Sequence, residues 1–380
     1  MTIENKYFEK ISEISKREYK NILGETESPF VSFEFLNALE ISNSVGIQSG
    51  WQPNHLGVYD KDELSAFMPL YIKNNSHGEF IFDHQWSYAL NRAGRNYYPK
   101  LVTAIPFTPC KTEKFIGGSN LDSSYFIDSI KELMEEKNIE TWHLLFPNKD
   151  LEPILEKNNF IKRSGYRFEW NNKNYSDFES FLKVFTSRQR KNIRAERKKI
   201  KNLDISFNIK NRDNLTATDW DIFYKFYKNT YEERMQAPYL NEDFFELVHA
   251  NKDSLNPVIF FAVHNNKPIA GSLCFQGKNT LYGRHWGASH NIDNLHFECC
   301  YYQGIEYCIN NNINFFDPGV QGEHKIRRGF EPIRCDSYHL ILRDDFRSAI
   351  QAFCKEEKKS IDNYLMACQE YTPIKKEYRI

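Results

Sequence analysis

The chain has 380 residues, which is enough for two domains of ordinary size, each with its own core. Its formal net charge of −1 excludes the overall basic field of a dedicated nucleic-acid-binding protein, although local basic patches remain. The eight cysteines include no Cys-x-x-Cys pair, and the first residues lack the apolar run of a signal peptide, so we expect reduced thiols in a cytoplasmic protein. The sequence contains no run of the roughly 20 apolar residues that a transmembrane helix needs.

In the first half, the apolar pattern predicts helices alternating with strands. Ser32 is a suitable N-cap for a helix over residues 32–42, and a polar turn at 60–63 joins strands at 55–59 and 64–72 into a hairpin. Residues 73–110 have no regular pattern, and their many aromatic side chains predict an ordered lining of a cleft. The half ends with a helix at 123–136, a strand at 141–146, a short helix at 153–157 and a strand at 166–170.

The second half repeats this order of elements. A basic helical segment at 176–201 precedes a strand at 204–207, a helix at 219–234, a shorter helix from about 241, and a hairpin of strands at 257–263 and 269–275. A strand at 280–286 that breaks at Gly287, a helix at 295–310, a strand at 313–316 and a covering helix at 346–366 follow. The recurrence predicts a mixed α/β protein of two duplicated units, with domains at 1–172 and 173–380.

A dense group of charged side chains lies between glycines near the end of the second half, at residues 319–329. Long polar side chains beside permissive backbone are typical of a functional loop, so we interpret this segment as the floor of an active site. His324 is a candidate general base or a structural hydrogen-bond partner. Lys325 and Arg328, with Gln321 nearby, suit a phosphate, a carboxylate or a developing oxyanion, or they are surface charges.

Two neighbouring segments supply further candidates. Glu298, at the start of the helix at 295–310, is either a general base or a residue that the helix dipole favours there, and Tyr301 and Tyr302 share its surface. On the strand at 280–286, alternation directs Tyr282 and Arg284 to one face and His285 to the other.

The irregular segment of the first half contributes polar and aromatic candidates for substrate binding: His77, Asp83, Trp86, Tyr98 and Lys100. The spacing of His and Asp here does not resemble a metal site, so no metal is predicted. The sequence lacks the glycine-rich motifs that bind nucleotide phosphates and the elbow motif that presents a nucleophilic serine.

The basic helical segment contains Arg190, Arg194 and Lys198. Such a charge run is most often a solvated helix face. The alternative is contact with a phosphate-bearing substrate such as tRNA, because few acidic residues compensate the charge.

With these residues considered, the chain resembles the FemAB-like predicted N-acyltransferases, which are related to the Gcn5-type acetyltransferase fold. The matching motifs include SPFVSFEFLNALE, SHGEFIFD, YYPKL, PFTP, SRQRKNIRAER, LYGRHWG, LHFECCYYQGIEY and PGVQGEHKIRRGF, and they span nearly the whole chain in order. The resemblance implies two tandem acetyltransferase-like domains. One departure is Glu169, where the resemblance leads us to expect a histidine. If that histidine contributes to the chemistry of relatives, this chain has a changed substrate or uses His324 or Glu298 instead.

The resemblance and the residues together predict an enzyme that joins an activated acyl group to an amine of a small molecule or peptide. The donor is acyl-CoA or aminoacyl-tRNA, each a co-substrate rather than a bound cofactor. Glu298 or His324 would remove the amine proton, and Arg284, Lys325 or backbone amides would stabilise the oxyanion. The alternative is a noncatalytic binding module that retains the fold.

Overall fold

The computed structural model describes residues 3–118, 123–320 and 322–379. The chain divides into two compact units, and it passes between them several times. The first unit comprises Met1–Thr26, Phe30–Gly165 and Arg334–Asp362, and the second comprises Glu27–Pro29, Tyr166–Ile333 and Asn363–Ile380. This division differs from the single predicted boundary at residue 172, because a segment near the C-terminus groups with the first unit.

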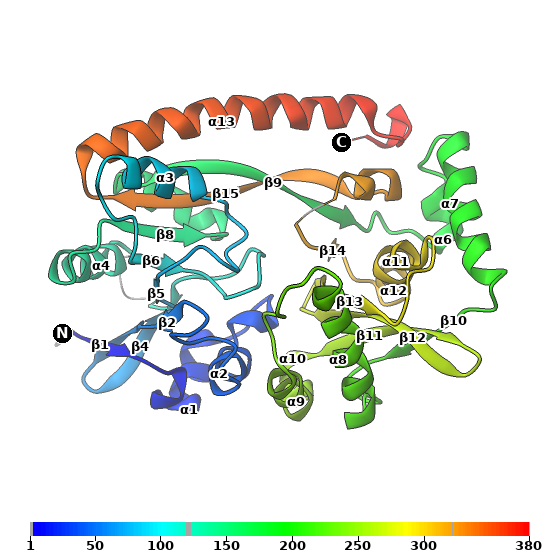
Figure 1. The fold of residues 1–380 in the computed structure, drawn as a ribbon, viewed down its shortest axis with the longest axis horizontal. Helices are drawn as coiled ribbons and strands as arrows, with labels where there is room; N and C mark the ends of the chain where they lie inside the picture. The colour runs from blue at the N-terminus through cyan, green and yellow to red at the C-terminus, as the bar shows by residue number, and fades with distance from the viewer. Residues whose placement is uncertain (1–2, 119–122, 321, 380) are drawn as a thin grey trace. The chain divides into compact units, whose positions relative to one another are not determined.

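The first unit contains two sets of paired strands (Figure 1). One sheet has the order β1-β3-β4-β7, with β1 (Ile3–Phe8), β3 (His55–Asp60), β4 (Glu63–Met68) and β7 (Ile116–Gly117). The second set has the order β2-β5-β6-β8-β15, with β2 (Trp51–Pro53), β5 (Tyr71–Lys73), β6 (Lys100–Thr103), β8 (Thr141–Leu145) and β15 (Glu331–Ile341). Strands β6 and β8 are parallel. The helices are α1 (Lys16–Leu23), α2 (Phe33–Ile41), α3 (His84–Arg92), α4 (Ser124–Glu136), α5 (Glu152–Lys157) and the first part of α13 (Asp344–Tyr371), with short 3-10 turns at Ile11–Glu13, Pro29–Val31 and Lys149–Leu151.

The core of the first unit explains why α4 forms where the apolar spacing predicts it. Ile127, Ile130 and Met134 are fully buried on one side of α4, and they pack in one cluster with Leu101 of β6 and Trp142 of β8. Each such burial contributes about 1.5–3 kcal/mol. The predicted cap is also present, since Ser32 Oγ accepts a hydrogen bond from the Phe35 amide at 3.2 Å.

Two expectations for the first unit were wrong. The second strand of the predicted hairpin is divided into β4 and β5, which pair with different partners. Residues 73–110, predicted to be irregular, contain α3 and β6. The helix was missed because its apolar face is short: within α3 only Trp86 and Leu90 are buried.

The second unit contains a sheet with the order β10-β11-β12-β13-β14-β9. Its strands are β9 (Ile161–Asn171), which begins in the first unit, β10 (Ser206–Lys210), β11 (Pro257–His264), β12 (Lys267–Gln276), β13 (Thr280–Ala288) and β14 (Phe315–Asp317). The helices are α6 (Phe178–Leu182), α7 (Ser187–Lys201), α8 (Ala217–Glu232), α9 (Glu242–Ala250), α10 (Lys252–Leu255), α11 (Leu295–Phe297) and α12 (Gln303–Asn310), with 3-10 turns η5 (Glu323–Arg328) and η6 (Lys376–Tyr378). Between α11 and α12, η4 (Glu298–Tyr302) is a π-helix.

Alternation along β11 separates two layers of helices. Phe260 belongs to the core cluster that also contains residues of η4 and α12, whereas Phe261 packs with Phe223 of α8 around Gly271. Adjacent residues of a strand point to opposite faces, so α8 and the η4–α12 helix cover opposite faces of this sheet. In the described parts of the chain, no helix is both long enough and apolar enough to cross a bilayer.

Candidate active site

The second unit has a point where two parallel strands part. β13 and β14 pair over only three positions, the last of them Tyr282 with Asp317. β14 ends there, while β13 continues to Ala288. In open α/β sheets, ligands bind beyond the carboxyl ends of parallel strands. The residues that follow Asp317 therefore occupy the position expected for a site.

A β-bulge lies on β13 at the same level. Leu273 pairs with His285 and Cys274 pairs with Gly283, so Arg284 is an extra residue without a cross-strand partner. Bulges of this kind redirect side chains and often lie beside active sites. The Arg284 guanidinium lies 5.3 Å from the Tyr282 ring centroid. His285 instead packs on α8, with its ring centroid 5.1 Å from that of Tyr227.

The strand break predicted at Gly287 was therefore misplaced. The strand continues through Gly287 to Ala288. A Cβ atom at Gly287 would lie 1.9 Å from the backbone oxygen of Phe226. This glycine permits close packing of β13 on α8, and the irregularity of the strand lies at Arg284.

A buried carboxylate at the end of β14 joins the bulge to the following loop. Asp317 accepts hydrogen bonds from Arg167 Nη1 at 2.8 Å, from Arg284 Nη2 at 3.2 Å and from the Gly319 amide at 2.9 Å. Burial alone would raise its pKa, but the two arginines outweigh this effect and hold the pKa of Asp317 below its usual value. Arg167 also binds Glu169 at 2.9 Å. Sequence reasoning did not select Asp317, and the only signal was an acid at the end of an apolar strand.

Lys325 lies on η5, and its side chain turns back toward this loop. It is 2% exposed, and its amine donates to the Gly319 carbonyl at 2.8 Å. Burial lowers the pKa of Lys325 to about 8, although Asp317 opposes the shift. Such an amine is charged at neutral pH, yet it can exchange its proton near that range.

His324 is at the surface beside Lys325. Its Nε2 is 2.9 Å from the hydroxyl of Tyr301, and burial, Arg328 and Lys325 lower its pKa below the usual value. The imidazole is therefore mainly neutral at pH 7, which is the form that accepts a proton. Gly322 has φ of +115°, and a Cβ there would lie 2.4 Å from His324 Cε1, so this glycine leaves room for the ring.

Glu298 has a different environment. It is 2% exposed at the start of the π-helix, and its Oε1 accepts from Arg197 Nε at 3.0 Å and from Gln303 Nε2 at 2.8 Å. Arg197 also binds Glu306 at 2.8 Å. The two predicted bases thus belong to different contacts: Glu298 anchors α7 to the helix, whereas His324 binds Tyr301.

Glu196 provides a second contact from α7, to the segment η5 that contains His324 and Lys325. Arg328 donates to the His324 carbonyl and to Glu196 Oε1, both at 2.8 Å, and its guanidinium lies 3.3 Å from the Phe297 ring centroid. Tyr302 donates to the other oxygen of Glu196 at 2.5 Å. The inner side of α7 therefore fixes both η4 and η5. Gln321 lies outside the described residues.

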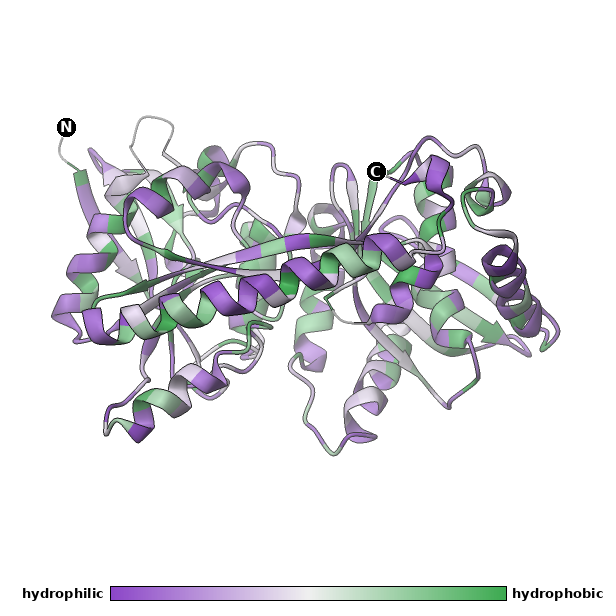
Figure 2. Ribbon diagram, turned by 90° about the horizontal axis from the view of Figure 1, so that it is seen from above, coloured by the Kyte–Doolittle hydropathy of each residue, from purple (hydrophilic) through white to green (hydrophobic). Residues whose placement is uncertain are grey.

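The exposed residues of α7, which form its outer side, are mostly hydrophilic (Figure 2). Arg194 pairs with Glu179 at 2.5 Å, Arg190 donates to Ser187 at 3.3 Å, and Lys198 is exposed.

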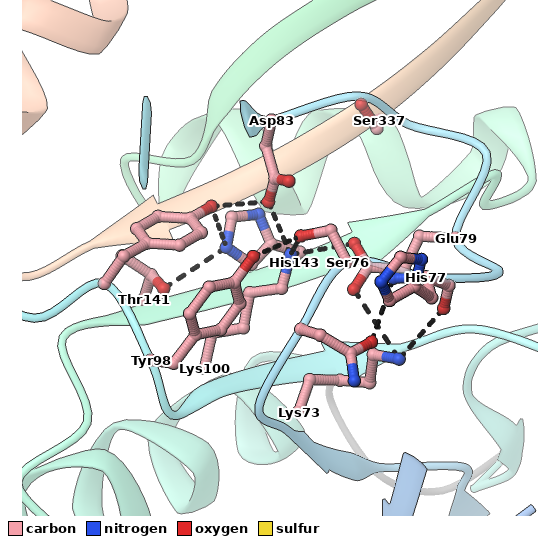
Figure 3. Close-up of polar contacts among 12 residues, drawn as sticks. Lys73, Ser76, His77, Glu79, Asp83, Tyr98, Lys100, Thr141, His143 and Ser337 are labelled. Carbon is pink, nitrogen blue, oxygen red and sulfur yellow. Dashed lines mark hydrogen bonds and ion pairs between the residues drawn. The ribbon is translucent and has the colours of Figure 1, made fainter. Parts of the chain in front are cut away.

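In the first unit, the predicted residues Asp83 and Lys100 belong to a buried polar cluster, and Tyr98 and His77 lie at its edge (Figure 3). Lys100 binds Asp83, and Tyr98 is 2.8 Å from Ser76, which also accepts from Lys100. The Trp86 ring centroid lies 4.8 Å from that of His339. His77 is exposed and contributes its carbonyl. Sequence reasoning missed four members of the cluster, namely Lys73, Tyr97, His143 and His339. For the lysine and the two histidines, a usable signal was a basic side chain in an otherwise apolar strand. Among the residues described, none of the groupings of His, Cys, Asp and Glu is suited to hold a metal ion.

The FemAB-like family model, described as peptidoglycan biosynthesis and recognition, matches residues 10–376. No curated protein matches significantly. FemX is similar in structure, with 11% identity, a TM-score of 0.50 and coverage of 92% of this chain and 100% of FemX. A protein of unknown function from Bacteroides thetaiotaomicron has 12% identity, a TM-score of 0.52, and coverage of 89% and 99%. L-PGS from Bacillus licheniformis has 9% identity, a TM-score of 0.50, and coverage of 85% and 94%. These likenesses confirm the predicted tandem acetyltransferase-like fold.

Proposed function

Because the chain belongs to the FemAB-like family, we propose that it is an amide-forming transferase that moves an acyl or aminoacyl group from an activated donor to an amine. The observation that carries this proposal is the buried Lys325 amine beyond the end of β14, beside the arginine-held Asp317. Acyl transfer develops negative charge on the carbonyl oxygen, and a pre-positioned, desolvated cation stabilises that charge strongly. The enzyme is tested directly by incubating it with radiolabelled donors and amine acceptors and measuring amide formation.

In this mechanism the amine attacks the carbonyl carbon of the thioester or ester. His324 removes a proton from the attacking nitrogen, and Lys325 donates a hydrogen bond to the oxyanion. Collapse of the tetrahedral intermediate breaks the bond to the thiol or alcohol, which leaves with a proton. In this proposal Arg284, Tyr282 and Tyr301 would contact the substrate, which is supported by the contacts of Arg284 with Tyr282 and of Tyr301 with His324. Arg328 holds His324 through a hydrogen bond to its carbonyl.

We expect His324→Gln to lower kcat by about 10²–10⁴-fold, because it removes the neutral imidazole that accepts the proton. Glu298→Gln should change kcat little, since Glu298 is engaged with Arg197 and Gln303. The pH–rate profile provides a further check: the wild type should gain activity as pH rises through a value below the ordinary histidine pKa, and His324→Gln should lose this limb. If a folded Glu298→Gln protein lost more kcat than His324→Gln, Glu298 rather than His324 would be the general base.

Aminoacyl-tRNA is the donor that the outer side of α7 favours. The exposed cationic positions recur at helical spacing, and phosphate contacts supply most of the affinity for nucleic acid. Acyl-CoA is the other donor class, and it would need its pyrophosphate near the start of α11.

Reversing charge at Arg190, Arg194 and Lys198 should raise KM for aminoacyl-tRNA at least about tenfold and flatten its dependence on salt. Turnover with small donors should be retained. Lys225→Glu with Lys267→Glu, which changes exposed lysines on α8 and β12, is the control and should leave KM unchanged. Activity that survives ribonuclease treatment would rule out the RNA donor while leaving the transferase itself in place.

A further inference from the structure

The buried polar cluster of the first unit has the composition of a binding site. Lys73 and Lys100 are completely buried, Asp83 is 1% exposed and Glu79 is 3% exposed. Each buried charge costs several kcal/mol of desolvation, and apolar replacements of such groups are often neutral or stabilising. Stability therefore does not explain why this unit retains four of them on one face.

The strand register brings the cluster together. Lys73 of β5 is directly opposite Lys100 of β6, and His143 of β8 is directly opposite His339 of β15. The loop between β5 and α3 supplies Glu79 and Asp83 above these strands (Figure 3).

Lys100 donates a hydrogen bond to one oxygen of the Glu79 carboxylate and one oxygen of the Asp83 carboxylate. Its amine donates to Glu79 Oε2 and Ser76 Oγ, both at 2.8 Å, and to Asp83 Oδ2. These bonds use all three of its protons. The other oxygens, Glu79 Oε1 and Asp83 Oδ1, are buried without a hydrogen-bond donor among the described residues, and the nearest amine to Glu79 Oε1 is Lys73 at 4.0 Å. Two buried carboxylate oxygens are thus unused.

A chain of hydrogen bonds holds the Asp83 carboxylate in its orientation. Tyr97 donates its hydroxyl proton to Asp83 Oδ2 at 2.6 Å. In its second contact, with His143 Nε2 at 3.2 Å, the Tyr97 oxygen must therefore be the acceptor. His143 Nδ1 must then accept from His339 Nδ1 at 2.5 Å, and His339 Nε2 accepts from Ser337 at 2.8 Å. Each histidine is neutral in this scheme, in agreement with burial, which lowers the pKa of His143 to about 3.

We propose that Glu79 and Asp83 bind a primary ammonium group in the first unit, with Glu79 Oε1 and Asp83 Oδ1 as its acceptors. A cation suits this position better than a neutral hydroxyl, because both unused atoms belong to carboxylates in a desolvated setting. Ser76 and Tyr98 are half-buried beside the cluster and form its rim. The inference concerns binding alone, so it does not depend on the transfer reaction.

Proton linkage distinguishes a cation from a neutral ligand. Burial raises the pKa of Glu79 to about 7, with Asp83 acting in the same direction and Lys100 and Lys73 against it. Burial lowers the pKa of Lys73 to about 7, opposed by Glu79 and reinforced by Lys100. An added cation favours the deprotonated form of each group, so binding near pH 7 should release protons.

The test is calorimetric titration of the whole protein with n-butylamine, and with n-butanol as the neutral probe of the same size, in buffers of different ionisation enthalpy. We expect saturable binding of the amine with proton release, and no comparable binding of the alcohol. Asp83→Asn should weaken the amine about 10-fold to 100-fold, because it removes a charged hydrogen-bond acceptor. Glu40→Gln is the matched control, since Glu40 is a buried acid of the same unit that binds His55 instead.

Carboxyl carbon resonances of the wild type provide a second readout if Asp83→Asn does not fold. Those of Glu79 and Asp83 should shift on titration with butylamine, and that of Glu40 should not. Equal behaviour of amine and alcohol, unchanged affinity in a folded Asp83→Asn protein, or unmoved resonances at Glu79 and Asp83 would each overturn the proposal.

Discussion

Lys325→Met should lower kcat by about 10²–10³-fold, the loss typical of one oxyanion-stabilising donor. Methionine preserves the length and apolar character of a side chain that is only 2% exposed, so packing should survive. The loss should appear in kcat more than in KM, because the charge that Lys325 contacts develops only in the transition state. Single-turnover measurements with saturating donor give this comparison directly.

The matched control is Lys114→Met. Lys114 is also a buried lysine, 1% exposed, and burial lowers its pKa to about 8 as well, but it donates to Thr112 within its own segment, in the first unit. It should retain wild-type turnover. Wild-type activity should also decline above about pH 8 as Lys325 loses its proton, and this decline should be absent in Lys325→Met. A Lys325→Met enzyme with full kcat would remove the amine from the mechanism.

Asp317→Asn should reduce the free energy of unfolding by about 3–5 kcal/mol, because it leaves the Arg167 and Arg284 charges without their shared buried counter-ion. Urea unfolding followed by circular dichroism measures the change. Glu179→Gln is the control, since the pair that Glu179 forms with Arg194 is more than half exposed and should contribute under about 1 kcal/mol.

The same carboxylate predicts how stability depends on pH. The folded-state pKa of Asp317 is lowered, so its contribution is fully present above the unfolded-state pKa of about 3.9 and is lost as pH falls through the folded value. Asp317→Asn should therefore be least different from the wild type in strong acid. A uniform difference across the acid range would show that Asp317 acts through packing alone.

Local signals in the sequence predicted much of the fold. Ser32 caps α2, the apolar spacing locates α4, and the Asn265–Asn266 turn, where both residues have positive φ, joins β11 to β12. These features depend on residues close in sequence. Residues 73–110 were misjudged because α3 is stabilised by partners far along the chain, including Phe346 and Ile350 of α13.

The candidate site was harder to predict for the same reason. His324 and Lys325 were recognisable from their glycine-rich surroundings. Asp317 acquires its role from Arg167, which is 150 positions away in sequence, and no periodic pattern reports such a contact. The bulge at Arg284 depends on the register between β13 and β12, which the sequence does not reveal. Gly287 was interpreted as the end of the strand, whereas it is a position of close packing on α8.

The division of the first unit into separate stretches of sequence affects the order in which the chain can fold. Its last stretch, Arg334–Asp362, supplies most of β15 and the first part of α13, which cover Trp86 and Tyr97. A ribosome delivers this stretch only after the whole sheet of the second unit has been made. During translation, the aromatic surface around Trp86 and Tyr97 therefore stays uncovered until the end of synthesis. In a protein truncated after residue 172, this surface would remain exposed to chaperones and proteases.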